Sequence, residues 1–501
     1  MSKLVYNSIL PHLRGFDKSF FQGYNSRAYE RKRCRMLQKF RNKFIGNKAF
    51  YLYVLGIAVP MIVQNAITSF VSFLDNIMVG QIGTEQMSGV AIVNQLIFVF
   101  NICIFGGVSG AGIFGTQFFG KGDYEGQKYT FRFKLYACAI ITLIALGLAL
   151  TLDTELISLY LNDTGSIGNI VLALEYGKEY LAVMLWGLVP FALSQAYGNT
   201  LRETGHTLTP MIASVAAVFS NLILDYLLIF GIGIFPTMGV AGAALATVIA
   251  RYLECIIVVV WTHFNPKRNK FIIGAYRSPR IPASILKVVM KKGTPLMINE
   301  VLWATGMTVI VQCYAVRGLE VVAAQNISST ITNLFNIVYI QLGSAISVVV
   351  GQLLGAGKLK EAKDADNKML FFVVTACMGM SALMILAGRA FPDIYNTEEG
   401  IKELARQFIV ISALVMPLCA FCHSTYFTLR SGGKTGVTFI FDAVYTWILV
   451  IPVAYFLSNC TPLAIVTVFW CVQSMEFVKA IIGYFMVKSD VWLVNIVNQG
   501  K

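Results

Sequence analysis

Two aspartates lie within apolar stretches of this sequence, at positions that suit the binding of a cation. Asp75 lies five residues before the glycine that ends one stretch, and Asp225 lies six residues before the glycine that ends another. Asn221 precedes Asp225 by four residues, which puts both side chains on one helix face, and Thr247 lies nine residues into a third stretch. Two carboxylates, an amide and a hydroxyl at matching depth suit oxygen ligation of a cation, or equally a proton held between the carboxylates.

Ionisable side chains at membrane depth are costly and therefore count as functional candidates. The alternative for Asp75 and Asp225 is that they cap or hydrogen-bond backbone near the ends of their helices. Other charged residues are expected to have structural roles. These are the i,i+3 pairs Arg251 with Glu254 and Glu476 with Lys479, and the loop contact of Asp442.

The elements that must position these residues are membrane helices. The chain is 56% hydrophobic and only 13% charged, with a mean hydropathy of +0.66. Apolar runs of about 20 residues, the length that crosses a bilayer, recur along it, so we expect an all-α polytopic membrane protein. Twelve spans are predicted, at about 50–79, 86–118, 132–152, 177–199, 209–231, 239–262, 294–316, 322–354, 369–391, 404–428, 436–457 and 463–487.

The sequence is an internal duplication. A shift of 235 residues matches identical residues across a 63-residue window, and a shift of 228 residues matches a second motif. Six spans per half is an even number, so the repeats are parallel, and we expect two pseudo-symmetric six-helix bundles with a substrate site between them. The repeat-related identities are Pro60 with Pro295, Gly83 with Gly318, Glu85 with Glu320, 100–102 with 335–337, Ser109 with Ser344, Gln117 with Gln352, Gly120 with Gly355, Gly122 with Gly357, and L-R-x-x-G-x-T at 201–207 with 429–435.

The repeated elements also hold the predicted hinges and the predicted cavity lining. Pro60 and Pro295 each remove a backbone hydrogen bond within a helix, so both helices are expected to kink there. Polar and aromatic side chains cluster in the four repeat-related helices, where they suit either interhelical hydrogen bonds or a wet cavity. Glu300 suits either a cavity or a helix end. The cavity candidates are Gln64, Asn65, Asn94, Asn101, Asn299, Glu300, Trp303, Asn336 and Tyr339.

Charge predicts the orientation and the domain limits. The net charge of +14 is concentrated in residues 1–48 and 263–292, and the loops rich in Lys and Arg alternate with loops poor in them. This alternation places both termini in the cytoplasm and the chain in the plasma (inner) membrane. The predicted divisions are a basic extension at 1–48, a first lobe at 49–262, a basic linker at 263–293, a second lobe at 294–487 and a tail at 488–501.

Several classes of function are disfavoured. The sequence contains no phosphate-binding G-x-x-x-x-G-K-[ST], no H-E-x-x-H and no G-x-S-x-G, so we expect neither ATP hydrolysis nor another enzyme activity. The ten cysteines are scattered, and Cys419-x-x-Cys422 followed by His423 has no second pair, so no metal site is expected. We expect no cofactor beyond H⁺ or Na⁺ as coupling ion, no nucleic-acid partner, and a monomer that takes a small organic, cationic substrate.

The chain resembles the multidrug and toxin extrusion (MATE) transporters over about residues 50–487. The resemblance implies a V-shaped pair of six-helix lobes that exports cationic compounds by antiport with H⁺ or Na⁺. It assigns the cation site to Asp75, Asn221, Asp225 and Thr247, and matches Pro60 to a proline whose bending accompanies protonation. The matching motifs are P-x14-D-x4-G at 60–80, L-R-x-x-G at 201–205 and 429–433, N-L-I-L-D-Y at 221–226, G-V-A-G-A-A-L-A-T at 239–247, and the duplicated Q-x-x-G-x-G.

One departure from the family pattern indicates a branch. Some members carry an acidic residue in helix 10, but the corresponding run PLCAFCHSTYF has only His423. This favours the branch whose cation site lies in the N-terminal lobe. Two alternatives remain: a flippase for lipid-linked precursors from the same superfamily, and a polytopic scaffold that does not transport.

Overall fold

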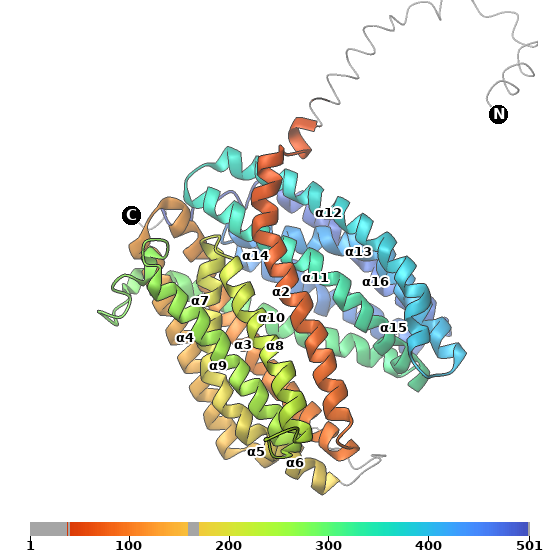
Figure 1. The fold of residues 1–501 in the computed structure, drawn as a ribbon. Coiled ribbons are helices and arrows are strands. Elements are labelled where there is room, and N and C mark those ends of the chain that lie inside the picture. Colours follow the sequence, from red (N-terminus) through yellow and green to blue (C-terminus); the bar gives the residue numbers. More distant parts are fainter. Residues whose placement is uncertain (1–37, 39–40, 159–169, 499–501) are drawn as a thin grey trace, which may run out of the picture.

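The chain folds into two helical bundles (Figure 1). The computed structural model describes residues 38, 41–158 and 170–498. In this part of the chain twelve helical segments are long and apolar enough to cross a membrane, and each coincides with one predicted span. The prediction of twelve membrane helices is therefore confirmed. Most of the predicted basic extension, at 1–37 and 39–40, lies outside the described residues.

The first lobe contains the helices up to residue 264. Its α2 and α3 follow one another through a short turn, and a 3₁₀ turn at Leu185–Gly187 joins α6 to α7 within one span. Its helices are α2 (Lys48–Gly80), α3 (Thr84–Lys121), α4 (Tyr124–Thr151), α5 (Asp153–Ser158), α6 (Ile170–Met184), α7 (Leu188–Glu203), α8 (Leu208–Phe230) and α9 (Gly239–Phe264).

The second lobe repeats this arrangement. Its first helix begins at Ala283, so the last residues of the predicted linker are helical. π-helical turns at Ile440–Val444 and Thr446–Val450 interrupt its penultimate span. Its helices are α10 (Ala283–Ala315), α11 (Leu319–Gly355), α12 (Leu359–Ala390), α13 (Glu399–Ser431), α14 (Thr435–Phe439), α15 (Ile451–Cys460) and α16 (Ile465–Lys488).

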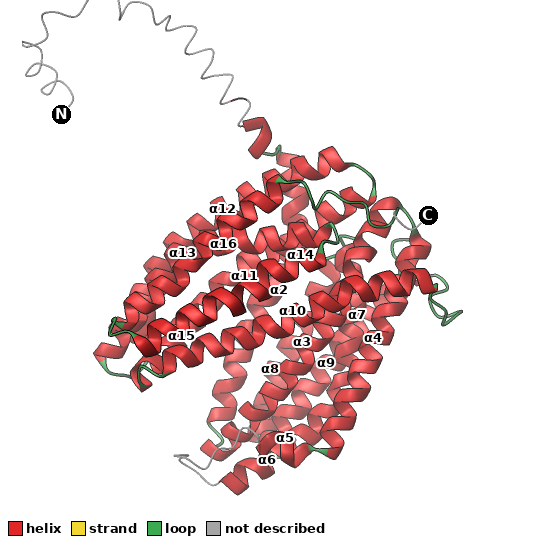
Figure 2. Cartoon of the chain, turned by 180° about the vertical axis from the view of Figure 1, so that it is seen from behind, coloured by secondary structure: helices red, strands yellow, loops and turns green. Residues whose placement is uncertain are grey.

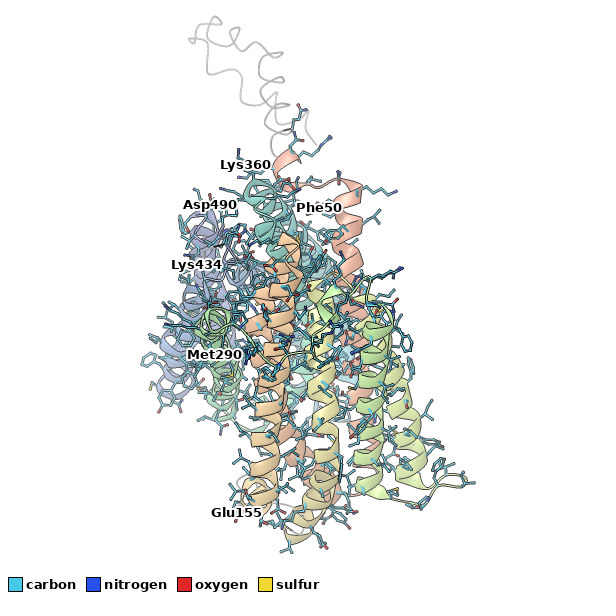
Figure 3. All side chains as sticks on the ribbon, turned by 90° about the vertical axis from the view of Figure 1, so that its left-hand side faces the viewer. Phe50, Glu155, Met290, Lys360, Lys434 and Asp490 are labelled. Carbon is cyan, nitrogen blue, oxygen red and sulfur yellow. The ribbon has the colours of Figure 1, made fainter. Side chains whose placement is uncertain are left out.

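The two lobes touch at one end and diverge toward the other, which gives the molecule a V shape (Figures 1 and 2). We call these the contact end and the divergent end. Helix α3 of the first lobe packs on α10 and α11 of the second at the contact end. Figure 3 shows Lys360, Lys434 and Asp490 toward the contact end and Glu155 at the divergent end.

Helix α2 belongs to both lobes. Its first half carries Val54, Ile57 and Met61, which are buried in the apolar core of the second lobe. Its last turns carry Val79, which is buried in the core of the first lobe. Pro60 lies where the helix leaves the second core, and the helix continues through it. The proline thus lies at the point where a change in the angle between the lobes must be absorbed.

Glycines allow the lobes to approach closely at the contact end. A Cβ atom added to Gly110 of α3 would lie 2.5 Å from the Cα atom of Gly293 in α10. One added to Gly106 would lie 2.9 Å from Met297 of the same helix. Small residues at such crossings let helix backbones pack directly in membrane proteins.

Substitution of Gly110 by alanine is therefore expected to weaken the contact between the lobes. The added methyl group meets backbone, which cannot rotate away, so we expect a loss of about 1–3 kcal/mol of stability. Thermal unfolding of purified protein in detergent measures it. Gly147→Ala in α4 is the control, because nothing lies within 4 Å of a Cβ there. Equal stability of the two variants would contradict the packing argument.

Candidate cation site

Three helices of the first lobe bring together the four predicted cation ligands. Asp75 is on α2, Asn221 and Asp225 are on α8, and Thr247 is on α9. Helix α8 packs on both α2 and α9. Asp75 and Asp225 lie near the last residues of α2 and α8, and Thr247 lies in the first half of α9, so all are toward the helix termini at the divergent end (Figure 1). The Asn221 amide lies 3.5 Å from the Thr247 hydroxyl oxygen, and the Asp75 and Asp225 carboxyl groups are close enough to interact electrostatically.

Among the described residues, no positively charged side chain forms an ion pair with either of the two carboxyl groups. Asp225 is 2% exposed, and neither of its oxygens has a well-formed hydrogen bond to any described residue. The same holds for Oδ1 of Asp75. Neither residue forms an ion pair within the described part of the chain, although twelve ion pairs occur there. A buried carboxylate without a partner costs several kcal/mol, so this arrangement calls for a cation or a proton.

The capping alternative does not describe Asp225. A capping carboxylate accepts a hydrogen bond from a backbone N–H, and both oxygens of Asp225 lack such a partner among the described residues. The helix containing Asp225 instead ends at Gly231, which adopts a left-handed conformation and satisfies the Leu227 carbonyl. Helix geometry at this end therefore does not require the aspartate.

A tyrosine links the carboxyl pair to the rest of the first lobe. Tyr180 of α6 is 4% exposed and interacts electrostatically with Asp75, Asp225 and Arg251. Its hydroxyl donates a hydrogen bond to Oδ1 of Asn94 at 3.3 Å. Tyr180 carries no charge or motif that marks it in the sequence, so only the packing of α6 against α3 and α9 reveals it.

Arg251 does not pair closely with Glu254 as its spacing predicts. Its guanidinium group lies 5.0 Å from the centroid of the Phe191 ring. It also donates a hydrogen bond to the Gly187 carbonyl at 3.4 Å. Glu254 interacts with both Arg202 and Arg251 at longer range. The two residues share a polar cluster rather than forming an isolated pair.

The cavity candidates of the first lobe differ in their surroundings. Gln64 accepts a hydrogen bond from Arg202 at 3.2 Å. The Asn65 amide bonds the Met61 carbonyl one turn back in its own helix. Oδ1 of Asn101 has no hydrogen-bond partner among the described residues. Of these residues, Asn101 has the most capacity left for a ligand or water.

In the second lobe two of the candidates, Asn299 and Glu300, belong to one polar network. Asn299 is 1% exposed; it donates to Asp442 at 3.0 Å and accepts from the Ala443 backbone within the π-helical turn. Glu300 accepts from the Tyr426 hydroxyl at 2.9 Å and lies 3.7 Å from Arg430. Glu300 and Asp442 thus have cationic or hydroxyl partners, in contrast to Asp75 and Asp225 of the first lobe.

Two predictions about this network were wrong. Lys479 pairs with Asp442 at 2.8 Å, rather than with Glu476 three residues before it. Asp442 accordingly has no loop role; it is partly buried and contacts Asn299 of α10 and Lys479 of α16. The reason is the orientation of α16 about its axis. Side chains three residues apart differ in direction around a helix, and here Lys479 faces a neighbouring helix while Glu476 does not pair with it.

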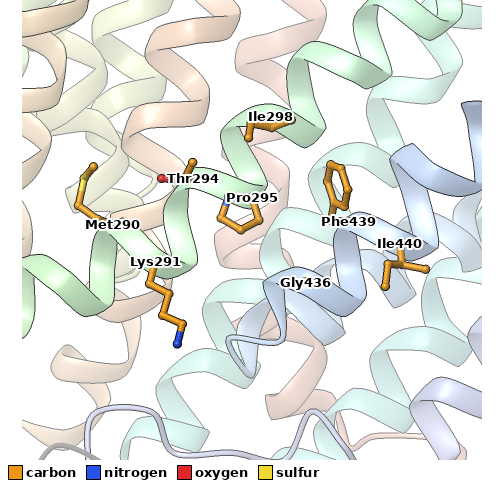
Figure 4. A pocket seen from close by; sticks show the side chains of 8 residues that line it. All are labelled: Met290, Lys291, Thr294, Pro295, Ile298, Gly436, Phe439 and Ile440. Carbon is orange, nitrogen blue, oxygen red and sulfur yellow. The ribbon is translucent and has the colours of Figure 1, made fainter.

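The remaining candidates lie apart from this network. Trp303 is 43% exposed, Asn336 is partly buried, and the Tyr339 ring contacts His423 with centroids 5.5 Å apart. Pro295 lines an apolar groove between α10 and α14 that also contains Thr294 (Figure 4). The described residues contain no group of three or more His, Cys, Asp or Glu suited to a metal.

Sequence reasoning missed a fully buried ion pair in the first lobe. Lys134 of α4 lies 2.5 Å from Glu203 of α7 and also donates to Thr200 at 3.0 Å. Both charged side chains are buried. The predicted span begins at 132, which puts Lys134 at its start, but α4 begins eight residues earlier, at Tyr124. A basic residue in a basic loop gives no signal of burial.

These features define a class: a polytopic membrane protein of two repeat-related six-helix lobes, with two unneutralised carboxyl groups in one of them. The family model MatE matches residues 60–227 and 295–456, so its two matched segments begin at Pro60 and Pro295. The chain belongs to the MATE family.

Known proteins agree with this assignment over most of the chain. The "Probable multidrug resistance protein NorM" of Thermotoga maritima is 25% identical over 404 residues, which is 80% of this chain and 84% of the relative. "Probable multidrug resistance protein YoeA" of Bacillus subtilis is 22% identical over 441 residues, or 87% and 92% of the two chains.

Solved structures share the fold. One described as the outward-facing conformation of a multidrug resistance MATE family transporter superposes with a TM-score of 0.78 at 19% identity, covering 87% of this chain and 95% of that one. A structure of MATE in the bent conformation gives 0.77 at 19% identity, covering 89% and 97%.

Proposed function

We propose that this protein is a secondary active efflux transporter that exports small organic cations in exchange for H⁺ or Na⁺. The observation that carries the proposal is the Asp75–Asp225 pair, which is largely buried and lacks a countercharge. Two such carboxylates repel each other unless a cation or a proton lies between them. Binding of the ion therefore changes the local free energy by several kcal/mol, enough to bias a conformational equilibrium.

The relatives support the choice of substrate class. Both are named probable multidrug resistance proteins. In the first lobe the uncompensated groups are acids, which attract cationic compounds. In the second lobe Arg430 lies near Glu300, and Lys479 is paired with Asp442. Both of these basic residues lie beside an acid, an arrangement that gives no support to binding of an anionic lipid-linked precursor, which the flippase alternative requires.

The shape of the molecule fits one step of an exchange cycle. If the basic loops are cytoplasmic, the contact end faces the cytoplasm and the divergent end faces outward. The ion site then lies in the outer half of the first lobe, where an ion can enter down its gradient. Ion binding at Asp75 acts on α2, the helix that belongs to both cores, and Pro60 lets its two halves move independently. Release of substrate to the outside would follow this movement.

An efflux assay in proteoliposomes tests the proposal. Purified protein is reconstituted into liposomes, and the liposomes are loaded with ethidium. A pH gradient is then imposed across their membrane, followed in a separate experiment by a Na⁺ gradient. We expect one of the two gradients to drive ethidium efflux and the other to have no effect on its rate. Efflux at the same rate with and without each gradient would contradict coupling, and no ethidium movement under either would contradict export of organic cations of this type.

A further inference from the structure

Two glutamines related by the internal repeat join the lobes at the contact end. Gln117 of α3 donates a hydrogen bond from Nε2 to the Ser431 carbonyl of the second lobe at 2.9 Å. Gln352 of α11 donates from Nε2 to the Glu203 carbonyl of the first lobe at 2.8 Å. Ser431 and Glu203 are themselves equivalent, since each follows the arginine of a duplicated L-R motif. Each lobe therefore binds the other through the same glutamine, which donates a hydrogen bond to the same backbone carbonyl position.

The backbones around these glutamines are also in reciprocal contact. A Cβ atom on Gly120 would lie 2.0 Å from the Gln352 carbonyl oxygen, and one on Gly355 would lie 1.9 Å from the Gln117 carbonyl oxygen. Gln117 is completely buried. The lobes cannot separate here unless both glutamines lose their hydrogen bonds.

The segment after the last helix breaks this symmetry. The Gln117 amide also donates to the Val494 carbonyl at 3.2 Å, and its Oε1 accepts from the Ile496 N–H at 2.9 Å. Asn495 donates to the Gly355 carbonyl at 3.1 Å. At the equivalent place on the other side, Oε1 of Gln352 accepts instead from the Tyr53 hydroxyl at 3.0 Å.

Apolar contacts hold the same segment against both lobes. Ile496 is 9% exposed and belongs to a cluster with Phe114 of α3 and Leu296 of α10. Before it, Trp492 is 1% exposed, and its carbonyl approaches the backbone of Gly432. An ion pair between Lys363 and Asp490 fixes the start of the segment. It thus crosses the junction between the lobes and is not a free tail.

We propose that residues 494–497 form a strap that keeps the contact end closed and must leave Gln117 before the lobes can separate there. Every hydrogen bond of the strap to Gln117 ends when α3 moves away from α13, so the strap adds to the free energy of opening. Its place in a transport cycle rests on the proposed function. Its effect on closure does not, because it can be measured without substrate or ion gradient.

Hydrogen–deuterium exchange of the full chain in lipid nanodiscs tests the strap. The variant is truncated after Leu493, which keeps the buried Trp492. The reporter is the peptide at 203–207, which meets the second lobe through Gln352 and forms neither a hydrogen bond nor an ion pair with residues 494–497 in the described structure. We expect exchange there to rise about ten-fold, since two or three hydrogen bonds no longer oppose opening. Peptides at the divergent end, at 80–88 and 316–322, are expected to show no increase. An unchanged reporter, or an equal rise at both ends, would overturn the proposal.

A double-mutant cycle distinguishes the specific effect of the hydrogen bonds between the strap and Gln117 from a nonspecific destabilisation caused by the truncation. Gln117→Ala and Gln352→Ala are matched, since the two residues are repeat equivalents with the same interlobe bond. On a logarithmic scale of exchange rates, truncation should add clearly less to Gln117→Ala than to Gln352→Ala, because the two hydrogen bonds between the strap and Gln117 are already lost in the first variant and only the contacts of Asn495 and Ile496 remain to be removed. Equal additivity with both glutamines would sink the proposal. If efflux fails in liposomes while the cycle shows this pattern, the strap stands and only the proposed function falls.

Discussion

The Asp75→Asn variant is expected to lose gradient-driven efflux completely, down to the leak rate of empty liposomes. Asparagine preserves the size of the side chain and one carbonyl oxygen, but it neither carries a negative charge nor takes up a proton. The repulsion from Asp225 that an ion relieves is then absent from the start, so the gradient has nothing to act on. Ethidium efflux under the effective gradient measures the loss, and Asp225→Asn should behave in the same way.

Asp153→Asn is the control for this experiment. Asp153 begins α5 near the divergent end and forms an exposed ion pair with Lys178 at 3.3 Å. Its loss is expected to leave efflux within about two-fold of the original, because exposed pairs contribute little. A monodisperse size-exclusion profile shows that the Asp75 variant folds. Full efflux by folded Asp75→Asn would remove Asp75 from the mechanism.

The Lys134→Met variant is expected to be strongly destabilised, by roughly 3–5 kcal/mol, because it leaves Glu203 buried without its cation. The Glu203 carboxylate lies against α3 at Gly112 and Gly115, where a Cβ atom would meet its oxygens. It therefore cannot turn toward water without moving α7. Thermal unfolding in detergent measures the effect.

Two further variants test whether the instability of Lys134→Met comes from leaving the Glu203 charge buried without a partner. Lys128→Met removes a cation from the same helix, at the same 2.5 Å from its partner Glu125, but that glutamate is 67% exposed. It should cost at most about 1 kcal/mol. Combining Lys134→Met with Glu203→Gln should restore much of the stability, since no buried charge remains. If Lys134→Met is no worse than Lys128→Met, the buried pair does not stabilise the lobe.

The sequence predicted the helices more completely than it predicted side-chain partners. Span length and hydrophobicity decide where a helix crosses the membrane, and the repeat checks each position twice. Side-chain partners depend on how each helix is rotated about its axis. In this chain the helical periodicity of apolar and polar residues is a weak guide to that rotation, because helices in lipid are apolar on every side. Lys479 shows this, since its sequence neighbour Glu476 is not its partner and Asp442, 37 residues away, is.

The proximity of Asp75 and Asp225 could be anticipated for a different reason. Both lie one to two turns before the end of a helix that runs in the same direction, so matching depth followed from counting residues alone. Lys134 offered no such argument, because its burial depends on where α4 begins. The strap could not be anticipated from the sequence, which predicts a cytoplasmic tail at 488–501. Residues 491–497 are largely apolar, but this composition does not indicate which surface they cover, and the contact with Gln117 is seen only in the structure.

The reciprocal contact of Gly120 with Gln352 and Gly355 with Gln117 has a further consequence. Gly355 is the repeat equivalent of Gly120, and Gln117 is that of Gln352, so the same contact occurs twice with the lobes exchanged. This reciprocity is typical of an isologous homodimer interface. In a dimer of identical six-helix chains, any carboxyl pair would occur in both halves and any terminal segment would meet both glutamines. Covalent fusion of the halves lifts that constraint. It allows one lobe to carry the Asp75–Asp225 pair while Glu300 and Asp442 of the other lie beside Arg430 and Lys479, and it lets one terminal segment bind a single glutamine.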